Sequence, residues 1–223
     1  MRSGKEESLV TGTLNPSLAQ SRTSEAAARE NLQEEAWVAA SQSGDNLAFN
    51  RLVLRWEGRI YNLALRMLQN EDEAAEATQE IFLLAFRNIR RFRRMSRFST
   101  WLYRIAANHC TTHLRQRPVE AHYSLDDENA EGSLDALLPA RESHEKELLR
   151  EEGRKRVISA LARLSPEQRI VVELKFFEEL TFEEISLAVQ APPSTVKTRL
   201  YSGLEILKSR LGQTIRRPRS EMK

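Results

Sequence analysis

The residues best suited to chemistry are arginines interleaved with aromatic side chains. Between residues 81 and 119 the chain has no acidic residue and nine arginines: Arg87, Arg90, Arg91, Arg93, Arg94, Arg97, Arg104, Arg115 and Arg117. The aromatic residues among them are Phe86, Phe92, Phe98, Trp101 and Tyr103. Arginines neutralise phosphates, and aromatic faces stack on unpaired bases. The mixture favours single-stranded or melting DNA, although for any one aromatic a place in a helical core is the commoner outcome.

A second basic segment lies at the C-terminus. From residue 196 to 223, eight bases (Lys197, Arg199, Lys208, Arg210, Arg216, Arg217, Arg219 and Lys223) outnumber Glu205 and Glu221. Between the two basic segments, residues 120–152 carry eleven acidic residues against three basic ones. The net charge of +2 over 223 residues therefore hides a pattern. Two basic segments around an acidic connector indicate two polyanion-binding units, whereas either segment alone is equally well a solvated helix face.

The C-terminal third has the helix start and stop signals of a helix-turn-helix. Ser165–Gln168 and Thr181–Glu184 are capping boxes, and each opens a helix. The break at Gln190–Pro193 precedes a longer basic helix that we expect Ser194 to cap. The residues near the start of that helix, where it would enter a major groove, are Ser194, Thr195, Lys197, Thr198 and Tyr201. Short helical hairpins elsewhere imitate this pattern, but the basic face favours DNA.

The remaining elements are also predicted to be helical. We expect a helix over 32–42, a long amphipathic helix capped by Asp45, a third helix over 74–85 and a fourth capped by Ser99. The fold class is therefore all-α, with two small helical domains joined by a flexible acidic linker. The predicted boundaries are a disordered tail over 1–30, a helical domain over 31–117, the linker over 118–150, the helix-turn-helix domain over 151–212 and a basic tail over 213–223.

Other classes of function are disfavoured. No run of 18 apolar residues exists, and the polar N-terminus has no secretory h-region, so we expect a soluble cytoplasmic protein without membrane insertion. The single cysteine, Cys110, allows no internal disulfide. His109, Cys110 and His113 lack a fourth ligand, so no metal is predicted. No GxxxxGK[ST], HExxH or GxSxG motif is present, and we expect no enzyme, cofactor or small-molecule substrate.

Three motifs resemble those of extracytoplasmic-function (ECF) sigma factors, in the order of that family. Residues 92–108 resemble the promoter-melting segment, and residues 73–82 resemble the helix that binds core polymerase. Residues 164–169 and 194–200 resemble the second DNA-binding domain. The resemblance spans about Leu32 to Leu211.

The resemblance implies a transcription initiation factor that directs core RNA polymerase to specific promoters, in the manner of stress-response regulators. The implied minus-ten and melting residues are Arg93, Arg94, Arg97, Trp101, Tyr103, Arg104 and Asn108. The implied minus-thirty-five residues are Ser194, Thr195, Lys197, Thr198, Arg199 and Tyr201. The implied polymerase-binding residues are Glu76, Gln79, Glu80 and Phe82. The implied partners are core RNA polymerase, promoter DNA and an anti-sigma factor.

The chain departs from the family pattern at several positions. Glu76 stands where Asp is usual, and Thr112 where an acidic residue is common. Gln190 replaces the usual turn glycine, so the turn must either take another route or adopt a strained backbone. Ser202-Gly203 replaces a common Arg-Ala pair, which predicts a missing DNA contact and a weaker helix. A stand-alone helix-turn-helix regulator and an RNA-binding or protein-interaction bundle are the alternatives. A simple repressor has no need for the arginine-aromatic segment.

Overall fold

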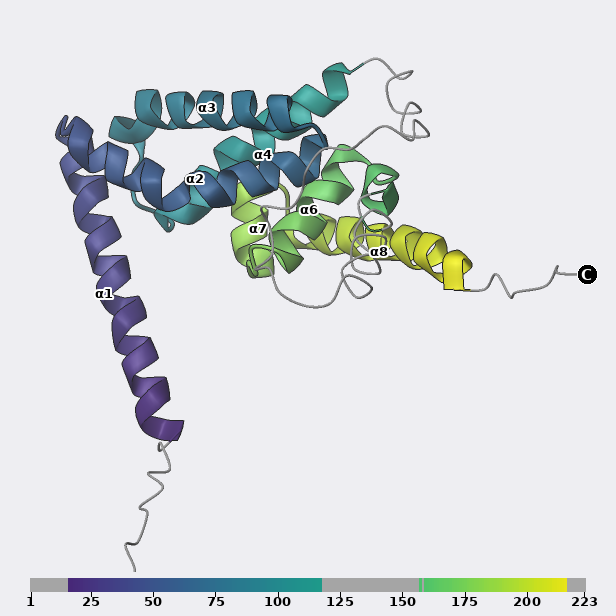
Figure 1. Ribbon diagram of the computed structural model, residues 1–223, viewed down its shortest axis with the longest axis horizontal. Coiled ribbons are helices and arrows are strands. Elements are labelled where there is room, and N and C mark those ends of the chain that lie inside the picture. Colours follow the sequence, from purple (N-terminus) through teal and green to yellow (C-terminus); the bar gives the residue numbers. More distant parts are fainter. Residues whose placement is uncertain (1–15, 118–156, 158, 216–223) are drawn as a thin grey trace, which may run out of the picture.

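The computed structural model describes residues 16–117, 157 and 159–215, and all of their regular structure is helical (Figure 1). Its elements are α1 (Pro16–Gln42), α2 (Asn46–Leu68), α3 (Glu71–Asn88), the 3-10 turn η1 (Ile89–Arg91), α4 (Phe98–Gln116), α6 (Pro166–Phe176), α7 (Phe182–Val189) and α8 (Pro193–Ile215). The all-α prediction is confirmed. The predicted linker over 118–150 and residues 216–223 of the predicted basic tail lie outside the described residues.

Helices α1 to α4 form a first helical unit, in which Asp45 caps α2 as predicted. The carboxylate of Asp45 accepts hydrogen bonds from the backbone amides of Leu47 at 2.8 Å and Ala48 at 3.1 Å, which starts α2. Asn70 caps α3 through the amide of Glu73 at 2.9 Å. These bonds satisfy amides that have no partner within the first turn of a helix.

Helix α1 is longer than the sequence pattern predicts. The tail expected to be disordered over 1–30 is helical from Pro16 onward, and residues 1–15 lie outside the described residues. The segment has no periodic apolar positions, but residues such as Ala26, Ala27 and Ala28 have high helix propensity. The N-terminal half of α1 projects away from the other helices (Figure 1).

Helices α6, α7 and α8 form the second unit. Both predicted capping boxes are present: Ser165 pairs with Gln168, and Thr181 pairs with Glu184. Two predicted caps are wrong by one or more residues. Helix α4 begins at Phe98 without a side-chain cap, so Ser99 lies in its first turn. Helix α8 begins at Pro193 and not after Ser194, because proline suits the first helical position. The amide of Val196 donates to the carbonyl of Pro192 at 3.0 Å.

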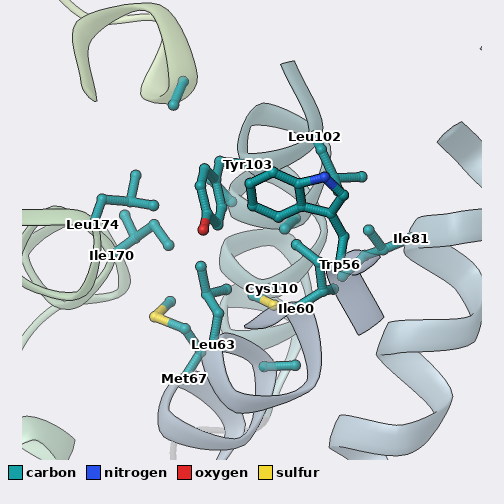
Figure 2. Close-up of a cluster of buried hydrophobic side chains, with 14 of the residues drawn as sticks. Trp56, Ile60, Leu63, Met67, Ile81, Leu102, Tyr103, Cys110, Ile170 and Leu174 are labelled. Carbon is teal, nitrogen blue, oxygen red and sulfur yellow. The ribbon is translucent and has the colours of Figure 1, made fainter. Parts of the chain in front are cut away.

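One hydrophobic core runs through both units. Figure 2 shows Tyr103 of α4 facing Ile170 and Leu174 of α6, with Leu63 and Met67 of α2 beside them. Helix α4 also packs against α7. The second unit therefore covers part of α4 in the first unit. None of the described helices combines the length and apolar character needed to cross a bilayer.

Candidate nucleic-acid interface

The arginine loop, residues 92–97 between η1 and α4, carries three of the exposed cations of the first unit. Arg93, Arg94 and Arg97 are exposed, and Arg94 adopts a left-handed backbone with φ 54°. On α4, Asn108 is exposed and Arg104 is half-buried. These five predicted DNA-contacting side chains are accessible from solvent.

The two predicted DNA-contacting aromatics, in contrast, are buried. Trp101 is 6% exposed, and its ring centroid lies 5.0 Å from that of Phe92 and 5.7 Å from that of Phe98. Tyr103 is 2% exposed, packs edge-on against Trp56 at 5.8 Å and donates its hydroxyl hydrogen to Glu178 of the second unit. Burial and the nearby Glu178 carboxylate raise the pKa of Tyr103, so its hydroxyl stays a donor. Both rings belong to the core.

A buried ionic cluster joins the units next to Tyr103. The guanidinium of Arg66 in α2 donates to Glu173 at 2.5 Å and to Glu178 at 3.1 Å. Glu173 is fully buried, and burial raises its pKa to about 7 although Arg66 opposes the shift. Its Oε1 has no hydrogen-bond partner among the described residues. This cluster was not predicted from the sequence, although a lone carboxylate inside the apolar run Ile170–Leu174 indicated it.

Arg169 strengthens the same contact. Its Nη1 donates to the carbonyl of Met67 at 2.6 Å, and its Nε donates to the carbonyl of Leu161 at 2.9 Å. Burial lowers the pKa of Arg169 to about 10, so it remains charged at neutral pH. A charged donor on the last carbonyls of α2 interacts favourably with the helix dipole. Arg169 therefore ties the second unit to the C-terminal end of α2.

A cleft of about 1160 Å³ opens between α1, the arginine loop and the segment that joins α6 to α7. Its lining cations are Arg55, Arg59, Arg94 and Arg97, and its lining carboxylates are Glu30, Glu34, Glu35, Glu178, Glu179 and Glu184. Arg55 pairs with Glu30 at 3.3 Å and with Glu34 at 3.1 Å. In this arrangement acidic side chains from α1 and from the second unit face the arginines.

Helix α8 presents its predicted reading residues to solvent. Ser194, Lys197, Thr198 and Tyr201 are exposed, while Thr195 and Arg199 are half-buried. Val196 and Leu200 on the opposite side are buried. The second unit therefore displays this face even while it is packed against the first.

The turn before α8 takes the backbone expected of a glycine. Gln190 adopts φ 53° and ψ 44°, the strained backbone of the two alternatives expected at this position. The hydroxyl of Ser186 donates to the carbonyl of Ala191 at 2.6 Å and closes the turn. In α8, Ser202 accepts a hydrogen bond from Gln168 at 3.0 Å, so it contacts α6.

The predicted polymerase-binding residues lie on α3. Glu76, Gln79 and Glu80 are exposed, whereas Phe82 is 8% exposed and lines a groove of about 500 Å³ between α2 and α3. The groove also contains apolar side chains that are not among the predicted polymerase-binding residues: Phe49, Val53, Leu83 and Phe86.

The histidine-cysteine segment of α4 does not gather into a site. Cys110 is fully buried, which raises the pKa of its thiol to about 12. His109 lies 3.5 Å from a carboxylate oxygen of Glu80, and burial lowers its pKa. Within the described ranges, no three His, Cys, Asp or Glu side chains are grouped to hold a metal ion.

Comparison with known proteins identifies the class to which this arrangement belongs. The family model for Sigma-70 region 2 matches residues 52–118, and that for Sigma-70 region 4 matches residues 154–207. These are the two units that carry the arginine loop and helix α8.

Two curated relatives place the chain in a narrower family within this class. The chain is 35% identical to the RNA polymerase sigma-H factor of Pseudomonas aeruginosa, over 82% of its own length and 96% of that protein. It is 31% identical to the ECF RNA polymerase sigma-E factor of Escherichia coli (strain K12), over 84% of its length and 99% of that protein. The chain belongs to the ECF sigma factors of RNA polymerase.

Solved structures agree in fold. CnrH in complex with the cytosolic domain of CnrY matches with a TM-score of 0.59 and 20% identity, over 81% of this chain and 98% of that one. The sigma factor RpoE of Bartonella quintana, in complex with the anti-sigma factor NepR, matches with a TM-score of 0.53 and 18% identity, over 74% of this chain and 96% of that one.

Proposed function

We propose that this sigma factor binds core RNA polymerase in the cytoplasm, with its first unit opening the minus-ten element and its second unit reading the minus-thirty-five element as duplex. The observation that carries the proposal is one chain with two different cationic surfaces. The arginine loop is a short exposed loop with a left-handed residue, and α8 is a regular helix with an exposed polar face. A helix suits a major groove, whereas a loop of cations suits a separated strand.

For the minus-ten element, we assign the phosphate and base contacts to Arg93, Arg94, Arg97, Arg104 and Asn108. Trp101 supports the loop from the core, because it packs between Phe92 and Phe98. Tyr103 is covered by the second unit in the present arrangement. If Tyr103 also contacts DNA, the second unit must first move away from α4.

For the minus-thirty-five element, we assign Lys197, Thr198 and Tyr201 to base edges and Arg199 to phosphate, with Ser194 and Thr195 at the helix start. Lys197 lies over the ring of Phe182 at 5.4 Å, which limits the range of its ammonium group. The sequence-specific contacts then come from one turn and a half of α8.

For polymerase, we assign the exposed face of α3 with Glu76, Gln79 and Glu80, together with the apolar groove that contains Phe82. Exposed carboxylates on the same helix as an apolar groove suit a helical partner with basic and apolar residues. An anti-sigma factor, also a proposed partner, would inactivate the chain by covering this face or either DNA-binding surface. A regulator of this kind has no reaction of its own, so we propose no catalytic role.

The decisive experiment is run-off transcription with purified core polymerase and candidate promoters. We expect promoter-specific transcripts only when the full-length protein is added. Promoter binding without polymerase, and no binding to core, would instead support a stand-alone helix-turn-helix regulator. Binding that is independent of promoter sequence would support an RNA-binding or protein-interaction bundle.

A matched pair of variants tests the placement on α8. Lys197→Ala should weaken minus-thirty-five binding by about 1–3 kcal/mol if Lys197 contacts a base. Lys208→Ala removes an equally exposed cation three turns further along the same helix and should change that binding much less. Equal protection of the minus-thirty-five element by both variants in footprinting would contradict the placement.

A further inference from the structure

Gln42, the last residue of α1, is hydrogen-bonded through its side chain to η1 and to the arginine loop. The side-chain amide nitrogen of Gln42 donates to the carbonyl of Ile89 at 3.1 Å and to the carbonyl of Phe92 at 2.6 Å. Its amide oxygen accepts from Nε of Arg94 at 3.0 Å. A primary amide has two N–H donors and one carbonyl acceptor, so both N–H groups and the oxygen are engaged. The three partners also fix which end of the amide carries the nitrogen.

These three bonds span the point where the backbone leaves helical geometry. After η1 the chain turns at Phe92, and Arg94 takes the left-handed conformation that residues with a Cβ adopt at a cost. Gln42 binds the chain just before this turn and the Arg94 side chain within it. The amide therefore offsets the cost of the left-handed residue and selects one loop conformation.

The turn between α1 and α2 keeps Gln42 in place. Gly44 has φ 101°, and a Cβ at this position would lie 3.3 Å from a terminal nitrogen of Arg90 in η1. The turn thus lies beside the Arg90 side chain, and α1 itself contacts η1, so the end of α1 stays next to the arginine loop. The support of the arginine loop comes from an element about fifty residues earlier in the chain.

Engagement through Nε orients the Arg94 guanidinium. In the described part of the chain, no other hydrogen bond holds that group, and Arg94 is exposed on the rim of the cleft. An arginine held at Nε still offers its two terminal nitrogens as a fork, which matches two oxygens of one phosphate. The held geometry reduces the rotamer freedom lost when a nucleic-acid strand binds.

We propose that Gln42 is a positioning residue for the minus-ten strand: it fixes the arginine loop and aims Arg94 at a phosphate of single-stranded DNA. This inference rests on the proposed function of the loop. Gln42 itself does not contact the DNA. It acts through the backbone at Phe92 and through Arg94.

The test compares holoenzymes that contain full-length wild type, Gln42→Met, Gln42→Glu or Ser43→Ala. Methionine keeps the length of the side chain and loses all three bonds, and glutamate keeps the acceptor for Arg94 but loses both donations. Ser43→Ala is the control, because Ser43 is the adjacent exposed residue and bonds only within α1, to the carbonyl of Ala39. The measurements are affinity for core polymerase, for a minus-thirty-five duplex and for a single-stranded minus-ten oligonucleotide.

We expect Gln42→Met to weaken minus-ten binding about tenfold, the effect of losing one to two net hydrogen bonds. Core and minus-thirty-five affinities should stay within about twofold. Gln42→Glu should resemble Gln42→Met, since its carboxylate would repel the carbonyls of Ile89 and Phe92. Ser43→Ala should match wild type.

Two results would overturn the inference: minus-ten binding by Gln42→Met equal to wild type, or an equal loss of core and minus-ten binding, which would indicate a general folding role. A wild-type holoenzyme that fails to bind the minus-ten strand would instead refute the proposed function of the loop. The two failures are therefore distinguishable.

Discussion

The two cationic surfaces of this sigma factor are built in opposite ways. Helix α8 exposes Lys197, Thr198 and Tyr201, and none of these side chains belongs to the hydrophobic core. The arginine loop depends on a buried aromatic layer beneath it and on hydrogen bonds from Gln42 of α1. We therefore expect that Lys197, Thr198 and Tyr201 can change without disturbing the fold, whereas substitutions around the loop should affect stability and the proposed DNA binding together.

The largest expected effect is a difference in stability between two variants, each of which removes one aromatic side chain from one of the two surfaces. Trp101→Ala removes a side chain that packs between two phenylalanine rings and should cost about 3–5 kcal/mol of unfolding free energy. Tyr201→Ala removes a side chain that is 59% exposed and should cost at most about 0.5 kcal/mol while weakening minus-thirty-five binding. Denaturant unfolding and footprinting measure the two quantities. Similar stability losses in both variants would remove the contrast between the surfaces.

The same contrast explains what the sequence could predict. The capping residues Asp45, Ser165 and Thr181 act within a few residues of the chain, so their positions follow from local pattern. The proposed DNA-contacting residues of α8 were selected by helical spacing and by the basic face, and their exposure follows the same spacing. A surface that is regular and independent of packing is therefore visible in the sequence.

The parts that depend on distant contacts were not predictable in this way. Trp101 and Tyr103 have the residue types of a stacking surface, and only their burial assigns them to the core. Gln42 is an ordinary helix-terminal residue until the fold brings it to Phe92. The length of α1 was missed because intrinsic propensity, rather than an apolar face, favours its first turns.

The contact between the units offers the next test, at the buried pair of Arg66 and Glu173. Arg66→Ala leaves the carboxylate of Glu173 without its cation in a fully buried site, which typically costs about 3–5 kcal/mol. We expect the low end of that range, since Glu173 can take up a proton. Unfolding of the full-length protein measures the cost, and fluorescence transfer between labels on α3 and α8 measures separation of the units.

Arg115→Ala is the matched control for this contact. Arg115 also joins α4 to α6 by pairing with Glu167 at 2.5 Å, but its side chain is 61% exposed. An exposed pair contributes at most about 1 kcal/mol. If both variants behave alike, the buried cluster does not govern how the units pack.

The pKa of Glu173 predicts how this contact responds to pH. Burial raises the folded-state pKa from 4.5 to about 7, so between these values the folded protein holds a proton that the unfolded chain has released. Stability from this group is present at low pH and is lost as the pH rises toward 7. Arg66, Arg169 and Glu178 face the carboxyl group, and the pKa of Arg169, about 10, lies above that window.

Unfolding free energies of wild type and Glu173→Gln, measured from pH 4.5 to 8, test this dependence. Glutamine mimics the protonated acid, so the difference between the two proteins should grow as the pH rises toward 7 and level off above it. His109, whose pKa burial lowers, has the opposite slope and cancels in the difference. A constant difference across the range would show that Glu173 is ionised throughout.

The smallest expected effect concerns a glycine beneath the reading face. Gly203 lies inside α8, and a Cβ there would meet Val172 at 3.5 Å, Gln168 at 3.6 Å and Leu164 at 3.8 Å, all ordinary contact distances. Gly203→Ala should therefore raise the free energy of unfolding by about 0.5–1 kcal/mol through helix propensity alone.

Because the methyl group would point toward α6 and not toward the reading side chains, minus-thirty-five affinity should be unchanged. A variant that is more stable and binds DNA as wild type does would show that α8 can be stabilised independently of its reading face. A loss of DNA affinity would mean that the spacing between α6 and α8 sets the orientation of Lys197 and Tyr201, so that the second surface also depends on distant packing.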